Sequence, residues 1–147
     1  MRAVIQRVKE AQVKVGGQVI GQIAQGLLIF LGIAHDDSQS SADYLVKKIT
    51  ELRIFDDAKG KMNVSAQDAG GQFLVVSQFT LYGNCDKGRR PSFDEAADPV
   101  KGEMLYTYFV EQLKSTKAIV ATGQFRAMMD VSLTNDGPVT LIVDSRR

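Results

Sequence analysis

The longest apolar stretch of the chain reads LLIFLGIA and spans residues 27–34. It has no polar position at all, which is typical of a strand buried on both faces rather than of a strand with one wet face. The stretch is far too short to cross a bilayer as a helix, which takes about 20 residues. We therefore place residues 27–34 at the centre of a β-sheet.

Strand-like segments precede this stretch, and a helix follows it. Residues 3–15 mostly alternate apolar and polar side chains, and Gly16-Gly17 separates them from a second run at residues 19–23, which predicts a tight hairpin. After a polar segment, apolar residues recur at helical spacing and predict an amphipathic helix from about Ser40 to Phe55.

The second half of the chain adds four strands and one helix. Residues 72–82 form another strongly strand-like run, and an irregular basic loop follows at residues 83–93. Asp98-Pro99 predicts the start of a helix that continues to about Ser115. Gly102 lies inside this helix, where glycine costs about 1 kcal/mol relative to alanine.

Three further strands are predicted near the carboxyl end, at residues 118–121, 128–133 and 139–143. Residues 135–140 have the composition of a turn and are expected to join the last two strands. The order of all these elements predicts an α+β fold, in which one domain over residues 1–147 combines a mixed β-sheet with two main helices.

The composition excludes several classes of protein. The 147 residues are 44% hydrophobic and 24% charged, with a formal net charge of +1, which rules out a disordered tail, a collagen-like repeat and a strongly basic nucleic-acid binder. The one cysteine, Cys85, allows no internal disulfide, and the one histidine, His35, allows no two-histidine zinc site. Residues 1–7 lack the features of a signal peptide, so we expect a cytoplasmic protein.

Common catalytic motifs are missing. Gly21 and Gly26 have the spacing of a phosphate-binding loop, but Leu27 stands where that loop needs lysine. His35 opens a polar loop, where a surface role is the commoner one. Cys85 precedes three cations that can lower the pKa of a thiol, although an incidental thiol is the simpler interpretation. We expect no metal and no cofactor, and an enzyme without a standard general base.

Two segments are unusual for a scaffold. SQFTL at residues 77–81 puts polar side chains into an apolar strand, and NDGPVT at residues 135–140 is a turn that contains a glycine–proline bond. Ser77 and Thr80 would point to opposite faces of an ideal strand, so both can serve one pocket only if the strand ends or bends near residues 78–79. An ordinary strand and an ordinary turn remain possible for these residues.

Four segments together resemble the D-aminoacyl-tRNA deacylase family. They are SQFTL and NDGPVT, the first strand MRAVIQRV at residues 1–8, and GRRPSF at residues 88–93, all in the family's order. The resemblance implies a barrel-like twisted sheet and a homodimer that acts as an editing enzyme. Such an enzyme hydrolyses the ester that joins a D-amino acid, or mischarged glycine, to the terminal adenosine of tRNA.

The resemblance also assigns roles to residues of this chain. Gly137 and Pro138, joined by a cis bond, form a chiral gate that reaches the partner's pocket with its backbone carbonyls toward the substrate's α-carbon. The residues that line the pocket around the adenosine and the scissile carbonyl are Ser77, Gln78, Phe79 and Thr80, with Met129 as a further lining residue. Arg7 braces the gate.

Catalysis in this interpretation relies on the substrate itself. An aminoacyl ester is already activated and a neighbouring ribose hydroxyl can assist water, so the protein supplies positioning and backbone N–H groups near Phe79 and Thr80. Candidates for contacts with tRNA phosphates are Lys87, Arg89 and Arg90, with Arg146 and Arg147 as further candidates.

Three alternatives stay open from the sequence. In the first, the chain is a noncatalytic tRNA-binding or dimeric interaction module. In the second, it is a hydrolase that uses the Cys85 thiol. In the third, it is a deacylase in which the Thr80 hydroxyl acts as nucleophile. Solvated loop charges are the alternative to phosphate contacts for the basic residues.

Overall fold

The computed structural model describes residues 1–145, and its architecture is organised by the first strand, β1 (Arg2–Val15). One edge of β1 pairs antiparallel with β3 (Gly26–Gly32) and, farther along, with β2 (Gln18–Ile23). Its other edge pairs with β8 (Asp130–Asp144). The predicted hairpin is confirmed, since Gly16 and Gly17 turn the chain with φ of 57° and 81°, which glycine adopts readily.

The apolar stretch at residues 27–34 supplies the central strand, as predicted. β3 lies between β1 and β6 (Gln72–Ser77), which runs parallel to β3, and β6 pairs in parallel with β7 (Val120–Thr122). The sheet curls until β2 meets β7, where a Cβ added to Gly21 would lie 2.4 Å from the carbonyl oxygen of Thr122. Only a residue without a side chain allows this close approach. Because β2 and β7 meet here, the mixed sheet is nearly closed, like a barrel.

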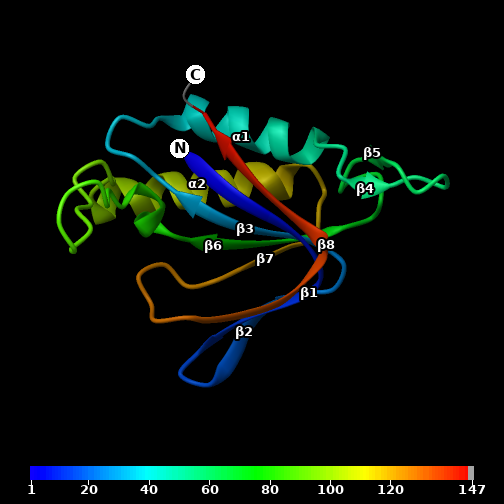
Figure 1. The fold of residues 1–147 in the computed structure, drawn as a ribbon, viewed down its shortest axis with the longest axis horizontal. Helices are drawn as coiled ribbons and strands as arrows, with labels where there is room; N and C mark the ends of the chain where they lie inside the picture. Colours follow the sequence, from blue (N-terminus) through cyan, green and yellow to red (C-terminus); the bar gives the residue numbers. More distant parts are fainter. Residues whose placement is uncertain (146–147) are drawn as a thin grey trace.

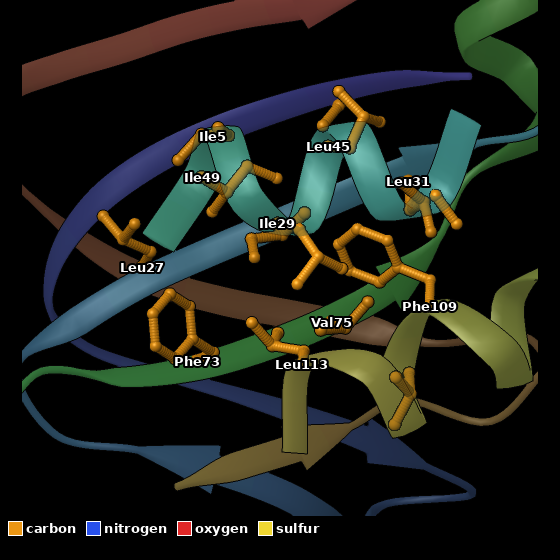
Figure 2. Packing of buried hydrophobic residues seen from close by; sticks show 14 of the residues in the cluster. Ile5, Leu27, Ile29, Leu31, Leu45, Ile49, Phe73, Val75, Phe109 and Leu113 are labelled. Carbon is orange, nitrogen blue, oxygen red and sulfur yellow. The ribbon is translucent and has the colours of Figure 1, made fainter. Parts of the chain in front are cut away.

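Two helices cover one face of the sheet (Figure 1). They are α1 (Gln39–Glu51) and α2 (Pro99–Ser115), and their apolar sides meet the alternate residues of β1, β3 and β6 that point toward them. Figure 2 shows Leu45 and Ile49 of α1 on one side of Ile29, with Phe109 of α2 on the other. A second cluster, on the opposite side of the sheet, fills the curled half between β1, β2, β3, β6 and β8.

The predicted helix start at Asp98-Pro99 is confirmed. The Asp98 carboxylate accepts hydrogen bonds from the backbone N–H groups of Val100 and Lys101, at 3.0 and 3.1 Å, and Pro99 begins α2. The prediction for the other helix was wrong at its end, because α1 stops at Glu51 rather than near Phe55. The chain is extended from Leu52 on and enters a small hairpin of β4 (Phe55–Asp56) and β5 (Met62–Val64), which the sequence analysis missed.

The strand predicted over residues 72–82 was wrong beyond Ser77. β6 ends there, and a 3-10 helix, η1 (Phe79–Tyr82), follows. The break falls at residues 78–79, where the pocket interpretation of SQFTL required it.

The two strands predicted at residues 128–133 and 139–143 are one strand, β8. Both halves pair with β1 in the same antiparallel sense, with Asn135 opposite Val8 and Thr140 opposite Gln6. Residues 136–139 therefore bulge outward opposite Arg7 instead of reversing the chain. The composition of the segment is that of a turn. The chain nevertheless pairs with the same edge of β1 again after the bulge, because β1 is long enough to pair with both halves of β8.

No helix among residues 1–145 is both long enough and apolar enough to cross a membrane.

Candidate functional site

The junction between β6 and η1 forms the first part of the site. β6 is held to the end of the sheet by the backbone N–H of Gln78, which donates to the carbonyl of Leu31 at 2.8 Å. The chain then turns into η1, where the Gln78 side-chain amide donates to the Thr80 hydroxyl oxygen. The first N–H groups of a helix have no acceptor within it, so those of Phe79 and Thr80 start the turn with their hydrogens available.

A cavity of about 590 Å³ opens beside this junction. Four of the predicted pocket residues line it: Ser77, Gln78, Phe79 and Met129. Thr80 is exposed next to Phe79 and is not among the lining residues. The structure thus gathers most of the predicted pocket residues, from β6, η1 and the segment before β8, around one hollow.

Two residues of the cavity lining, Gly102 and Phe125, were not predicted as pocket residues from the sequence. A Cβ added to Gly102 would lie 3.3 Å from Cζ of Phe125. The ring of Phe125 also packs with that of Tyr106, with centroids 5.8 Å apart. The one signal in the sequence was Gly102 itself, because a glycine inside a helix is unfavourable unless something packs closely against it.

Two of the described lining residues carry charge, Asp98 and Arg126. Asp98 uses its carboxylate as the cap of α2. Arg126 lies in the turn that follows β7, with a φ of 62°. Neither residue was predicted to belong to the pocket from the sequence.

The bulge of β8 contains the second signature segment. The bond between Gly137 and Pro138 is cis, and both residues are exposed. Asn135 closes the base of the bulge, because its side-chain oxygen accepts from the Val139 N–H at 2.8 Å. The bulge therefore presents its tip to the outside of the chain.

Arg7 holds the bulge from inside the protein. Its side chain is buried, and Nε donates to the carbonyl oxygen of Asp136 at 3.0 Å while Nη1 donates to that of Ile54 at 2.6 Å. The carboxylates of Asp56 and Asp136 each lie 3.6 Å from the guanidinium. This geometry fixes the position of the bulge, and the role of Arg7 as a brace for a gate stays a prediction.

The cavity and the bulge lie at opposite ends of the sheet. Val8, which lies beside the bulge, pairs with Gly26 of β3, and Gly26 pairs with Gln72 at the start of β6. The cavity lies at the other end of β6, near Ser77. Figure 1 shows β8 bending at its middle on the side where β6 begins. One chain therefore does not bring Gly137, Pro138 or Arg7 to its own cavity.

The basic loop adjoins the cavity. Lys87, Arg89 and Arg90 are exposed in it, and two backbone hydrogen bonds between Asn84 and Ser92, of 2.8 and 3.0 Å, close its base. Arg146 and Arg147, the other candidates for phosphate contacts, lie outside the described residues.

An aromatic pair connects this loop to the cavity. The rings of Phe93 and Phe79 pack edge to face, with centroids 5.0 Å apart and an angle of 66° between the rings. Cys85 is exposed in the loop, and neither it nor His35 lines the cavity.

This chain is similar in sequence to proteins of known family. The family model described as D-Tyr-tRNA(Tyr) deacylase matches residues 4–144. A protein from Thermosipho melanesiensis named D-aminoacyl-tRNA deacylase is 56% identical over 100% of this chain and 99% of its own length. Another with the same name, from Desulfatibacillum aliphaticivorans, is 58% identical over 99% of this chain and 100% of its own.

Solved structures agree with the fold. A structure titled c-Myc DNA Unwinding Element Binding Protein is 41% identical, covers 100% of both chains and has a TM-score of 0.95. A probable eukaryotic D-amino acid tRNA deacylase, 17% identical, matches in fold with a TM-score of 0.84 over 97% of this chain and 98% of its own. By the family model and by the identity of its full-length relatives, this chain belongs to the D-aminoacyl-tRNA deacylase family.

Proposed function

We propose that this chain removes D-amino acids, and mischarged glycine, from tRNA by hydrolysing the ester to the terminal adenosine. The observation that carries the proposal is the cavity at the junction of β6 and η1, in a chain that belongs to this family. In the reaction the oxygen of water bonds to the carbonyl carbon, and the bond from that carbon to the ribose oxygen breaks. The ribose oxygen takes up a proton that the water has lost. The products are tRNA and a free amino acid.

The surroundings of Thr80 favour catalysis assisted by the RNA. The group next to the Thr80 hydroxyl is the Gln78 amide, which is not a base at neutral pH, so nothing there removes a proton from the hydroxyl. The carboxylate of Asp98 is the only one among the described lining residues, and it is engaged as a helix cap. The ribose hydroxyl beside the ester then directs the water, and the protein positions the ester.

Backbone N–H groups supply the remaining stabilisation. Those of Phe79 and Thr80 start η1 at the edge of the cavity, where the oxygen of the tetrahedral intermediate acquires its negative charge. One well-placed donor of this kind contributes about 3–4 kcal/mol to the transition state. This contribution needs neither a catalytic triad nor a metal.

The bulge of β8 is the proposed chiral gate, and it acts in a partner's cavity. Gly137 and Pro138 are exposed at the tip, Arg7 fixes the base, and the cavity of the same chain lies at the other end of the sheet. A wall of backbone atoms excludes an L-amino acid whatever its side chain, and therefore admits many D-amino acids. Glycine passes as well, because it has no side chain that could collide with the wall.

An apolar face of the sheet provides the surface for the homodimer. Val4, Phe30 and Ile142 lie side by side on paired strands, and Ile142 is 71% exposed. An exposed apolar side chain beside two partly exposed ones is a favourable position for contact with a second copy of the chain. We expect Ile142→Asp to shift the chain from dimer to monomer in light scattering, whereas Met62→Asp, at an exposed residue of β5, leaves the mass unchanged.

The decisive experiment measures release of labelled tyrosine from tRNA charged with D- or L-tyrosine. We expect release from the D-form and none above the spontaneous rate from the L-form. Equal release from both forms, or release from neither, contradicts the proposal. A parallel reaction with glycyl-tRNA tests the second substrate.

A noncatalytic nucleic-acid-binding module is the second candidate. The observation in its favour is the 41% identical structure whose title names a DNA-unwinding-element-binding protein. This candidate predicts that the chain binds D-tyrosyl-tRNA in a filter-binding assay without releasing tyrosine. The exposed cations Lys87, Arg89 and Arg90 would serve either function, and the cytoplasmic location expected from the sequence fits both.

A further inference from the structure

Among the described residues that line the cavity, Arg126 is the one cation. Asp98, the other charged lining residue of this set, is engaged as the cap of α2. The guanidinium of Arg126 is exposed and makes no hydrogen bond or ion pair with any residue of 1–145. Within this part of the chain, the lining thus has one positive charge, on Arg126, which no side chain pairs, and one negative charge, on Asp98, which is held at the start of α2.

The backbone at Arg126 is unfavourable for a residue with a side chain. Its φ of 62° lies in the left-handed region, inside a turn closed by the Ala127 N–H, which donates to the Gln124 carbonyl at 3.2 Å. That conformation is unfavourable for a residue with a Cβ, and glycine adopts it without this penalty. A strained residue at the edge of a site suggests that its side chain serves the site.

We propose that Arg126 binds the phosphodiester directly 5′ of the terminal adenosine of the substrate. This inference rests on the proposed function, which puts that adenosine and its ester in the cavity. The chain of the tRNA then leaves through the rim, and its first phosphate is the group of opposite charge nearest to Arg126. A guanidinium fits phosphate oxygens with two parallel hydrogen bonds, so Arg126 holds the phosphate in one orientation.

This role differs from that of the basic loop. Lys87, Arg89 and Arg90 do not line the cavity, so they are placed to meet phosphates farther along the tRNA. Arg126 is instead a binding residue for the terminal nucleotide itself, and its effect must appear with a substrate that carries a single phosphate.

The test compares two small esters that differ by one phosphate. They are the 3′-D-tyrosyl ester of adenosine and the 3′-D-tyrosyl ester of adenosine 5′-monophosphate. The variant is Arg126→Gly, because glycine adopts a φ of 62° without strain and so preserves the turn. Lys117→Gly is the matched control, since Lys117 is an exposed cation with a φ of 66° outside the cavity.

We expect Arg126→Gly to raise KM for the phosphate-bearing ester about tenfold more than KM for the phosphate-free ester. Arg126→Lys should recover part of this difference, because a lysine keeps the charge but not the paired donors. With D-tyrosyl-tRNA, the binding constant of the Arg126→Gly variant should depend less steeply on salt concentration, by the amount expected for the loss of about one phosphate contact. Lys117→Gly should leave the ratio of the two KM values as it is in the unmodified protein.

An equal change in both KM values, or no change in either, overturns the inference. Thermal unfolding of each variant shows whether the fold is intact. If the unmodified protein cleaves none of the three esters, it is the proposed function that fails. If it cleaves them and Arg126→Gly behaves as Lys117→Gly does, only the assignment of Arg126 fails.

Discussion

At the scale of single residues, Phe93 joins the basic loop to the junction of β6 and η1. Its ring packs edge to face with that of Phe79, which is 58% exposed. An aromatic pair of this geometry contributes about 0.5–1.5 kcal/mol beyond the area that it buries. The pair therefore restrains the ring of Phe79, the first residue of η1.

Replacing Phe93 by alanine should lower kcat for D-tyrosyl-tRNA about three- to tenfold, because Phe79 loses its packing partner. Phe93→Tyr keeps the aromatic ring and should retain the rate of the unmodified protein. Single-turnover release of tyrosine measures both variants. A rate unchanged in Phe93→Ala would show that the ring of Phe79 is held by something else.

Tyr106 makes stability depend on alkaline pH. Its hydroxyl donates to the carbonyl of Val75 at 2.9 Å, and burial raises the pKa of Tyr106 from 10.0 to about 12. The unfolded chain loses this proton near pH 10 and the folded chain near pH 12, so the folded form binds more protons in between. The free energy of unfolding should therefore fall between pH 10 and 12, by up to about 3 kcal/mol from this group.

The control is Tyr106→Phe, which removes both the hydrogen bond and the titration. This variant should be less stable at pH 8 and lose less stability between pH 10 and 12 than the unmodified protein does. Urea unfolding at a series of pH values gives both curves. Parallel curves would contradict the assignment to Tyr106.

At the scale of elements, the bulge in β8 depends on a residue without a side chain. Gly137 has a φ of 134°, and a Cβ there would lie 2.8 Å from Cγ2 of Val139 and 3.1 Å from Nη2 of Arg7. Gly137→Ala should displace the bulge and allow release of L-tyrosine from tRNA, together with a loss of about 1–3 kcal/mol in stability. Gly60→Ala, where φ is 71° and nothing lies within 4 Å, should lose stability alone.

The ratio of release rates for D- and L-tyrosyl-tRNA checks this prediction. If the Gly137→Ala variant kept the same selectivity as the Gly60→Ala variant, the bulge would have no part in the gate. The comparison separates backbone strain, which both variants share, from the contacts, which only Gly137 makes.

Elements with a strong local signal were predictable from the sequence. The central strand, the hairpin at Gly16-Gly17 and the start of α2 at Asp98 each follow from apolar pattern or from turn and capping chemistry. The continuity of β8 was not predictable, because the edge of β1 rather than the local sequence sets it. The same holds for Phe125 and Arg126, which join the cavity only through tertiary packing.

At the scale of the whole molecule, the two ends of the described chain are tied together. The amino group of Met1 is buried, pairs with the carboxylate of Asp37 and donates to the Ser145 hydroxyl at 2.8 Å, while the Ser145 N–H donates to the Met1 carbonyl at 2.9 Å. Asp37 also accepts the N–H of Ala34 at 2.7 Å. Met1 thus connects the start of β1 to the segment before α1 and to the end of β8.

Extra residues before Met1 should destabilise the protein by about 3–5 kcal/mol, because they leave the buried Asp37 carboxylate without its cation. The same tag placed after the carboxyl end should not. Differential scanning calorimetry of the two tagged proteins and the untagged one checks this. Equal Tm values for all three would show that the amino group is dispensable.

The register that separates bulge from cavity has a genetic consequence. In the proposed dimer each active site combines the cavity of one polypeptide with the bulge of the other. A mutation of Gly137 in one polypeptide therefore affects the active site in the cavity of its partner. A cell that makes both an intact and a damaged copy would then build mixed dimers in which the intact copy is the one that misreads handedness. Mutations in the bulge are therefore expected to be dominant, whereas mutations of the cavity wall disable only the copy that carries them.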